Sequence, residues 1–242
     1  MNSAFLTSEL EALYAALPQF HAMPDGSPTT WGLNREALTA LAGEMRGGMT
    51  TLETGAGYST VMFAAANTRH TAIMMSQGEA DGIRAYCQSR GFKGTQNLIV
   101  GFSDRILPTM ADDSEELDLV FIDGGHAYPI PHIDWFYTAP RIKVGGLFVL
   151  DDIHIPAVRS LYDFLVAEPQ WKLEKVALYT AFFRKIAEDD YPKAWVEQTI
   201  NKPLVDQMNA ARNSLKTRII LYLASKPALK AFYRRFFKGM KA

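Results

Sequence analysis

The run of residues 49–60, Met-Thr-Thr-Leu-Glu-Thr-Gly-Ala-Gly-Tyr-Ser-Thr, constrains the fold more than any other part of the chain. An extended apolar stretch ends in Glu53, Gly55 and Gly57 open a turn, and an apolar helical stretch follows. Glycines let the backbone approach a ligand closely and adopt positive φ without penalty. A new helix presents unpaired N–H groups just past such a turn. The order predicts a strand, a glycine turn and a helix that form a cofactor cradle.

A Gly-x-Gly pair alone also fits a plain strand-to-helix turn with an exposed glutamate. The dinucleotide fingerprint G-x-G-x-x-G would place a third glycine where this chain has Thr60. A nicotinamide-dependent oxidoreductase is therefore a less favoured interpretation of this glycine turn. Glu53 itself is expected to accept hydrogen bonds near a cationic or amine-bearing ligand.

Short apolar strands alternate with helices along most of the chain. Strands are expected near 51–52, 71–75, 97–100, 117–122 and 147–150, and helices near 60–67, 80–90 and 132–139. Two further helices are expected upstream, near 8–17 with a capping box at Ser8–Glu11 and near 34–45, and two antiparallel strands downstream, at 173–178 and 180–184. This alternation predicts an α/β fold with a parallel sheet covered on both faces.

The composition fits one α/β domain with modest additions. Of the 242 residues, 48% are hydrophobic and 21% charged, and the formal net charge is -1. The single Cys87 excludes an intrachain disulfide framework and a cysteine-based zinc site. The first residues lack the basic start of a signal peptide, and no apolar run approaches the roughly 20 residues that span a bilayer. We therefore expect a cytoplasmic protein.

The last part of the chain is basic. From Asn201 onward there are 10 lysines and arginines against one acidic residue, Asp206. Apolar residues at 229, 232, 233, 236, 237 and 240 alternate with basic ones in the pattern of an amphipathic helix. This helix either packs on the domain or on a second copy of the chain, which would make a homo-oligomer, or lies on an anionic membrane as a peripheral contact. Nucleic acid is not an expected partner, because no recognised binding module is present.

Acidic residues follow two of the predicted buried strands. Asp123 ends the strand 117–122 and precedes Gly-Gly-His126, and Asp151, Asp152 and His154 follow the strand 147–150. Open α/β sheets bind ligands at the carboxyl ends of their strands. His126 fits a base, a metal ligand or a hydrogen-bonded loop histidine, and the acids fit either a hard divalent ion or a helix cap.

The run Leu-Glu-Thr-Gly-Ala-Gly-Tyr-Ser-Thr resembles motif I of class I S-adenosylmethionine (SAM)-dependent methyltransferases. The segment Leu-Asp-Leu-Val-Phe-Ile-Asp-Gly-Gly-His-Ala-Tyr, followed by Gly-Gly-Leu-Phe-Val-Leu-Asp-Asp, resembles the central part of the same superfamily. The similarity is greatest to methyltransferase family 24, and it covers about residues 31–156. The motifs are moderately specific one by one and much more specific in this order and spacing.

The resemblance implies a Rossmann-like three-layer sandwich: a mostly parallel seven-stranded sheet with a reversed last hairpin and helices on both faces. It also implies bound SAM. Together with the residue patterns at the two ends, we expect three parts of the chain: an N-terminal helical lead-in (1–48), the methyltransferase domain (49–200) and a basic amphipathic helical tail (201–242). The expected cofactor-binding residues are Glu53, Gly55, Ala56, Gly57, Ser59, Ser76, Phe102, Ser103, Asp104 and Asp123. The expected catalytic residues are Asp123, His126, Asp152 and His154, and by similarity to metal-dependent O-methyltransferases Asp123, Asp151 and Asp152 are the expected ligands of a magnesium ion.

The chain departs from the family pattern at the end of the second strand. The family usually has an acid there to bind the ribose hydroxyls, and Met74 occupies that position, with Ser76, Gln77 or Glu79 as substitutes. The leading hypothesis is SAM-dependent O-methylation of a small or lipid-linked acceptor, with the metal and the identity of the base left open. The alternative is a non-catalytic methyltransferase-fold binding protein that docks partners or membrane through its basic tail.

Overall fold

The computed structural model describes residues 3–22, 28–29, 32–110, 115–188 and 193–225. The chain divides into two compact units, Met1–Tyr191 and Pro192–Ala242. The predicted division into 1–48, 49–200 and 201–242 stays a prediction. Among the described residues, no helix has both the length and the apolar character needed to cross a bilayer.

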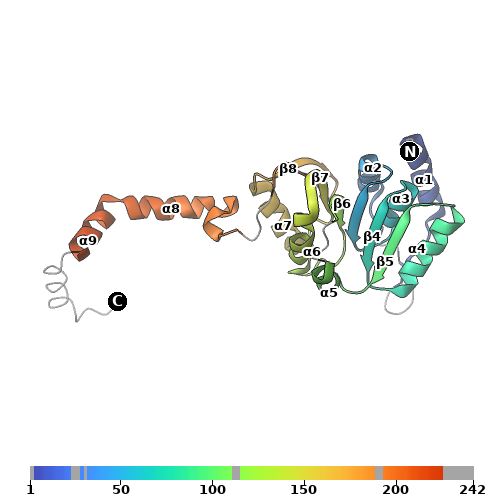
Figure 1. Ribbon diagram of the computed structural model, residues 1–242, viewed down its shortest axis with the longest axis horizontal. Helices are drawn as coiled ribbons and strands as arrows, with labels where there is room; N and C mark the ends of the chain where they lie inside the picture. The colour runs from blue at the N-terminus through green and yellow to red at the C-terminus, as the bar shows by residue number, and fades with distance from the viewer. Residues whose placement is uncertain (1–2, 23–27, 30–31, 111–114, 189–192, 226–242) are drawn as a thin grey trace. The chain divides into compact units, whose positions relative to one another are not determined.

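The first unit is built on a seven-stranded sheet in the order β5-β4-β3-β6-β7-β9-β8 (Figure 1). The strands are β3 (Thr50–Thr54), β4 (Arg69–Met74), β5 (Thr95–Val100), β6 (Leu117–Ile122), β7 (Ile142–Leu150), β8 (Trp171–Ala177) and β9 (Thr180–Lys185). Strands β3 to β7 are mutually parallel, and β9 runs antiparallel to β7 and β8. The predicted mostly parallel sheet with a reversed last hairpin is confirmed. A separate two-stranded ladder joins β1 (His21–Ala22) to β2 (Pro28–Thr29).

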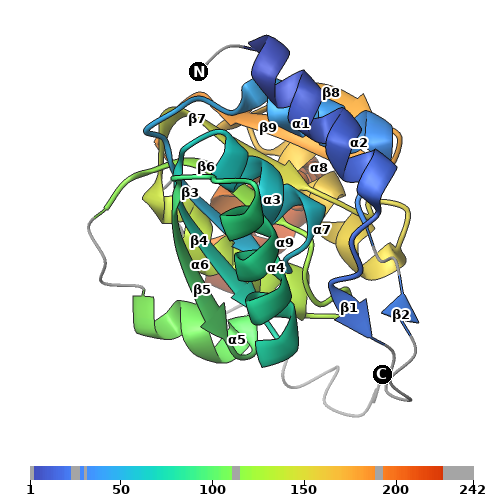
Figure 2. The ribbon, with the colours of Figure 1, turned by 90° about the vertical axis from the view of Figure 1, so that its right-hand side faces the viewer.

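Helices cover both faces of the sheet, which confirms the three-layer architecture. One face carries α1 (Ser3–Ala16), α2 (Arg35–Glu44), α3 (Tyr58–Ala65) and α4 (Gln77–Ser89). Figure 2 shows α3 and α4 in front of the sheet. The other face carries α5 (Ser103–Ile106), α6 (Ile130–Thr138) and α7 (Pro156–Ala167).

The period-two geometry of the strands divides the core into two layers. On β6, Phe121 packs with α3 whereas Val120 packs on the opposite side of the sheet, and both are fully buried. On β7, Val149 and Phe148 divide in the same way. The central strands are apolar on both faces for this reason, as parallel strands between two helical layers must be.

Two helices differ from the expectations, and a third lies where a helix after Asp151–Asp152 was expected. Helix α1 begins at Ser3 instead of at the capping box near Ser8, because Leu6, Leu10 and Leu13 continue one buried face toward the N-terminus. The four-residue α5 was not foreseen. Helix α7 follows Asp151–Asp152 as a helix of 12 residues, beginning with Pro156 at its first turn.

The second unit contains α8 (Lys202–Asn213) and α9 (Leu215–Ser225), preceded by the short 3-10 turns Trp195–Glu197 and Thr199–Asn201. No residue of α8 is buried. Its apolar side chains Leu204 and Met208 are exposed, as are Ile219, Leu221 and Tyr222 on α9. The amphipathic helix predicted from residue 229 onward lies outside the described residues.

Candidate active site

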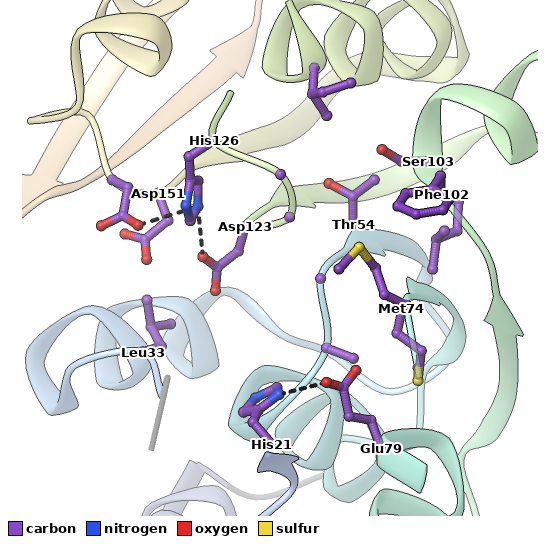
Figure 3. A pocket seen from close by; sticks show the side chains of 18 of the residues that line it. His21, Leu33, Thr54, Met74, Glu79, Phe102, Ser103, Asp123, His126 and Asp151 are labelled. Carbon is purple, nitrogen blue, oxygen red and sulfur yellow. Dashed lines mark hydrogen bonds and ion pairs between the residues drawn. The ribbon is translucent and has the colours of Figure 1, made fainter. Parts of the chain in front are cut away.

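A cleft of about 1030 Å³ opens along the carboxyl edge of the parallel strands (Figure 3). The loops that follow β3, β4, β5, β6 and β7 all contribute to it, as does the segment that precedes α2. Its lining includes His21, Thr54, Gly55, Ala56, Met74, Glu79, Phe102, Ser103, Asp104, Asp123, His126, Asp151, Asp152, Leu178 and Tyr179. The position is the one that open α/β sheets use for ligands.

The glycine turn after β3 borders the middle of the cleft through Gly55 and Ala56. Gly55 has φ +84°, and a Cβ there would lie 2.3 Å from the backbone oxygen of Asp123. Only glycine fits, since both the conformation and the close approach of the two loops exclude a side chain. The turn after β3 and the end of β6 are thereby packed backbone to backbone.

Glu53 lies beneath this turn and is not among the described residues that line the cleft. The pleat of β3 directs it toward α3, where its side chain is fully buried. Its Oε1 accepts the hydroxyl of Thr60 and lies 3.1 Å from Nε2 of His70. Thr60 in turn accepts the backbone N–H of Gly57 at 2.9 Å. Glu53 thus reaches the glycine turn through Thr60.

His70 completes this buried group below the glycine turn. Its Nδ1 lies 2.8 Å from Oγ1 of Thr51, and its ring stacks on Phe63 with centroids 4.2 Å apart. The group joins β3, β4 and α3 in the layer behind the cleft. Sequence inspection placed Glu53 at a ligand, because it treated the last residues of the strand as edge residues.

Three residues from two loops meet at one end of the cleft. His126 Nε2 lies 3.2 Å from Asp152 Oδ2 and 3.8 Å from Asp123 Oδ1, and Figure 3 shows a dashed line from the imidazole to Asp123. The neighbouring Asp123 carboxylate and the charges of the other nearby carboxylates raise the pKa of His126 above its ordinary value. Burial raises the pKa of Asp123 to about 7. A histidine that holds a proton readily therefore faces the cleft.

The other two residues predicted after β7 lie differently. Asp151 is buried and accepts the hydroxyl of Thr180 on β9, and burial raises its pKa. His154 is not among the described residues that line the cleft; its ring lies against Tyr179, with centroids 4.3 Å apart, and its Nδ1 is 3.6 Å from Asp152 Oδ1. Asp151 therefore lines the cleft while it is bonded to Thr180, whereas His154 contacts Asp152 from outside the set of lining residues.

The described residues contain one group suited to a metal ion. Asp123, His126 and Asp152 each offer a ligand atom, and these atoms lie within 4.8 Å of one another. This group shares Asp123 and Asp152 with the predicted magnesium ligands, but it has His126 where the prediction has Asp151. An imidazole nitrogen suits transition ions such as manganese better than magnesium.

The loop after β5 forms the opposite end of the cleft with Phe102, Ser103 and Asp104. The Phe102 ring is 55% exposed and has the Arg105 guanidinium 5.4 Å from its centroid. A flat, exposed ring at this place offers a stacking surface to an aromatic base. Ser103 and Asp104 add polar groups beside it.

A buried acid that sequence inspection missed supports this end of the cleft from α6. Asp134 is fully buried, and its Oδ2 accepts the Thr54 hydroxyl at 2.7 Å. Burial raises the pKa of Asp134 to about 6. The hydrogen bonds from Ser103 and Thr54 act in the opposite direction but are outweighed. Because Thr54 and Ser103 line the cleft, Asp134 links the ends of β3 and α5 behind it. No motif marked it, since its partners lie far away in sequence.

The end of β4 carries Met74, which lines the cleft, and the first turn of α4 carries Glu79. Glu79 Oε1 lies 3.1 Å from Nδ1 of His21, a residue of β1 that sequence inspection also missed (Figure 3). Ser76 caps α4 by accepting the Glu79 N–H at 3.4 Å. Ser76, Gly57 and Ser59 are not among the described residues that line the cleft.

Comparisons with known proteins agree with this geometry. Residues 52–153 match the family model described as a methyltransferase domain, Methyltransf_24. With the fold and the site, the match identifies residues 52–153 as a class I SAM-dependent methyltransferase domain of the family 24 type. No curated protein matches the sequence significantly.

Solved structures share the fold at low sequence identity. The O-methyltransferase TomG from Streptomyces achromogenes, involved in tomaymycin synthesis and solved with SAM, is similar with a TM-score of 0.56 and 18% identity over 75% of this chain and 89% of that one. An O-methyltransferase from Bacillus cereus in complex with SAH is similar with a TM-score of 0.54 and 16% identity over 76% and 90%.

Proposed function

We propose that this protein transfers the methyl group of SAM to a hydroxyl oxygen of a small-molecule acceptor. The observation that carries the proposal is the Asp123–His126–Asp152 group, which faces the same cleft as the Gly55 turn. The fold supports the cofactor, as do the similar structures that were solved in complex with SAM and with SAH.

The residues of the cleft fit the parts of the cofactor in order. Phe102, Ser103 and Asp104 would hold the adenine, and Gly55 and Ala56 would border the amino-acid part. The sulfonium would then lie near Asp123, whose carboxylate favours a positive charge. Glu53 would act on this arrangement only through the Gly57 N–H that Thr60 holds.

His126 is the residue best placed to accept the proton of the acceptor hydroxyl. Bound SAM would supply the methyl group and leave as SAH when its sulfur–methyl bond breaks. His126 would take the hydroxyl proton as the acceptor oxygen bonds to the methyl carbon. Asp123 and Asp152 stabilise the imidazolium that results, because both carboxylates lie within 4 Å of its Nε2. Asp152 also fixes the ring from the loop after β7, so that the base is oriented before the acceptor arrives.

The same three residues fit a divalent ion as the alternative to a free base. A bound ion would lower the pKa of the acceptor hydroxyl, and the protein would then contribute Asp123, His126 and Asp152 as ligands. Magnesium, named by the resemblance, needs oxygen-rich coordination, whereas the imidazole here favours manganese or another transition ion.

The acceptor would enter beside the β8–β9 turn. Leu178 and Tyr179 line the cleft there, and about half of each side chain is exposed. The turn is held to the loop after β7, because Ile153 N–H donates to the Tyr179 carbonyl at 3.0 Å. These two side chains offer an apolar wall to the body of the acceptor, next to the carboxylates that surround its hydroxyl.

The experiment that tests the proposal measures binding first and turnover second. Calorimetry with SAM and with SAH should show saturable binding, and absence of binding at millimolar ligand would favour the non-catalytic alternative. Turnover of a panel of hydroxylated small molecules should then be lost in Asp123→Ala while the circular dichroism spectrum is unchanged. Full activity of Asp123→Ala would remove Asp123 from the reaction.

We also infer that the basic second unit contacts an anionic membrane surface. Support comes from the excess of basic residues after Asn201 and from the exposed apolar side chains of α8 and α9. Deletion of residues 226–242 should release the protein from vesicles of anionic lipid in a sedimentation assay. Equal sedimentation of both forms, or a change in oligomeric state alone, would favour self-association instead.

A further inference from the structure

We propose that Glu79, oriented by His21, binds the ribose hydroxyls of the cofactor in the place of the missing strand-end acid. The inference rests on the proposed function, because it concerns the same cofactor. It assigns the pair to a recognition site that is built from α4 and from β1.

Met74, the residue at the end of β4, cannot bind the ribose hydroxyls. Met74 lines the cleft but is almost completely buried, and a thioether sulfur is only a weak acceptor. Met75, the next residue, lines the cleft with a side chain that is 71% exposed and equally apolar. A pair of neighbouring hydroxyls that met only these two side chains would lose the hydrogen bonds it makes with water.

Of the three polar substitutes nearby, only Glu79 reaches the cleft. The Ser76 hydroxyl caps α4, and Gln77 donates to Asp81 at 2.9 Å on the exposed side of the helix. Glu79 lines the cleft with a side chain that is 18% exposed. Its position in the first turn of α4 also suits a carboxylate, since helix N-termini stabilise negative charge.

His21 holds the Glu79 carboxylate in place and leaves it able to bind. Its Nδ1 lies 3.1 Å from Oε1, and the side chain of His21 is 12% exposed. A carboxylate has two oxygens with about four acceptor positions. The contact with His21 therefore fixes the rotamer while Oε2 stays available to accept from two neighbouring hydroxyls. Figure 3 shows both side chains turned toward one another at this end of the cleft, with Met74 beside Glu79.

His21 also lies against the glycine turn. A Cβ on Gly57 would be 3.2 Å from its Nε2, so the imidazole occupies the space between the turn and α4. The ribose of a cofactor that reaches from Ala56 to Phe102 would lie in the same cleft that His21 and Glu79 line. Through His21, β1 thus contributes to the proposed cofactor site.

Calorimetric titration of the full chain with SAH, and with SAH that lacks the ribose 2′-hydroxyl, tests the inference. Loss of a charge-assisted hydrogen bond pair should make SAH binding to Glu79→Gln about 10–100-fold weaker. The decisive result is the coupling: removal of the 2′-hydroxyl should weaken binding to the wild type about tenfold or more, and binding to Glu79→Gln about twofold or less. A purely structural role of Glu79 would leave the penalty for the missing hydroxyl equal in both proteins.

Two further variants complete the design. His21→Ala should weaken SAH binding about 3–10-fold, because the carboxylate loses its support but not its charge. Asp81→Asn, on the exposed side of the same helix, is the matched control and should bind SAH as the wild type does. If the wild type binds SAH, and Glu79→Gln binds SAH and the 2′-deoxy analogue as tightly as the wild type does, this inference fails and the proposed function stands. If the wild type binds no SAH, the proposed function fails.

Discussion

The Thr60 hydroxyl donates to the carboxylate of Glu53, so that the acid of motif I is bonded behind the cleft and does not line it. Glu53 is fully buried between β3, β4 and α3, and among the described residues its Oε2 has no hydrogen-bond partner. The same Thr60 oxygen accepts the Gly57 N–H. The acid therefore determines the shape of the glycine turn from behind.

Thr60→Val should destabilise the fold and weaken cofactor binding together. The substitution keeps the volume but removes the donor to Glu53 and the acceptor for Gly57 N–H. The buried N–H then loses its acceptor, and the Glu53 carboxylate keeps the His70 contact at 3.1 Å but loses its hydroxyl donor. The expected loss is about 1–3 kcal/mol in the free energy of unfolding, measured by urea denaturation, with SAH binding at least several-fold weaker. Thr39→Val, at an exposed helical threonine, is the control and should change neither quantity substantially. Wild-type stability of Thr60→Val would show that water or rearrangement satisfies both groups.

The sequence was sufficient for the features that depend on local pattern. Alternating strands and helices, the turn at Gly55 and the acids that follow β6 and β7 all have a periodicity or a neighbour that marks them. Asp123 and Asp152 could be placed at one edge because parallel strands end together. His126 could be placed in the same site because it follows Asp123 by only three residues in the sequence.

The remaining features depend on contacts between distant segments. Asp134 meets Thr54 across 80 positions and His21 meets Glu79 across 58, so no local pattern could indicate either pair. The direction of Glu53 depends on the register of β3, since one step along a strand turns a side chain to the other face. Helix α5 has four residues, too few for a helical period to show.

His126→Gln should lower turnover by about 10²–10⁴-fold with little effect on cofactor binding. The imidazole is the group that takes the proton, whereas it touches the cofactor at most indirectly. Steady-state kinetics with an accepted hydroxyl compound, together with SAH calorimetry, measures the two effects separately. His132→Gln, on α6 and bonded to Ser160 outside the cleft, is the matched control and should keep turnover within about threefold. Wild-type turnover of His126→Gln would transfer the role of base to Asp152 or to a metal-bound hydroxyl.

Asp134→Asn should remove a pH dependence of stability between about pH 4 and pH 6. Burial raises the pKa of Asp134 from 3.8 to about 6, so the folded protein holds this proton more tightly than the unfolded chain. The resulting stability is fully present below about pH 4 and is lost as the pH rises through 6, by an amount on the order of 3 kcal/mol. Asparagine carries no charge and can still accept the Thr54 hydroxyl.

Urea denaturation of the wild type and of Asp134→Asn at pH 4, 5, 6 and 7 measures this dependence. The stability of the variant relative to the wild type should rise across the series and level off near pH 7. Asp163→Asn, at an exposed surface pair with Arg159, serves as the control. A constant difference between wild type and Asp134→Asn at all four pH values would mean that Asp134 has an ordinary pKa.

Metal titration separates the two candidate ligand sets, because Asp151 and His126 each belong to only one of them. If Asp123, His126 and Asp152 hold the ion, the chelator-treated protein should bind Mn²⁺ in calorimetry, and Asp152→Asn and His126→Gln should each weaken that binding at least tenfold. Asp151→Asn should lower the free energy of unfolding, since it disturbs the buried contact with Thr180, but keep Mn²⁺ affinity within about threefold. A tenfold loss in Asp151→Asn with none in His126→Gln would restore the all-carboxylate set. No heat of binding for any divalent ion, with turnover unaffected by chelator, would leave His126 to act as a free base.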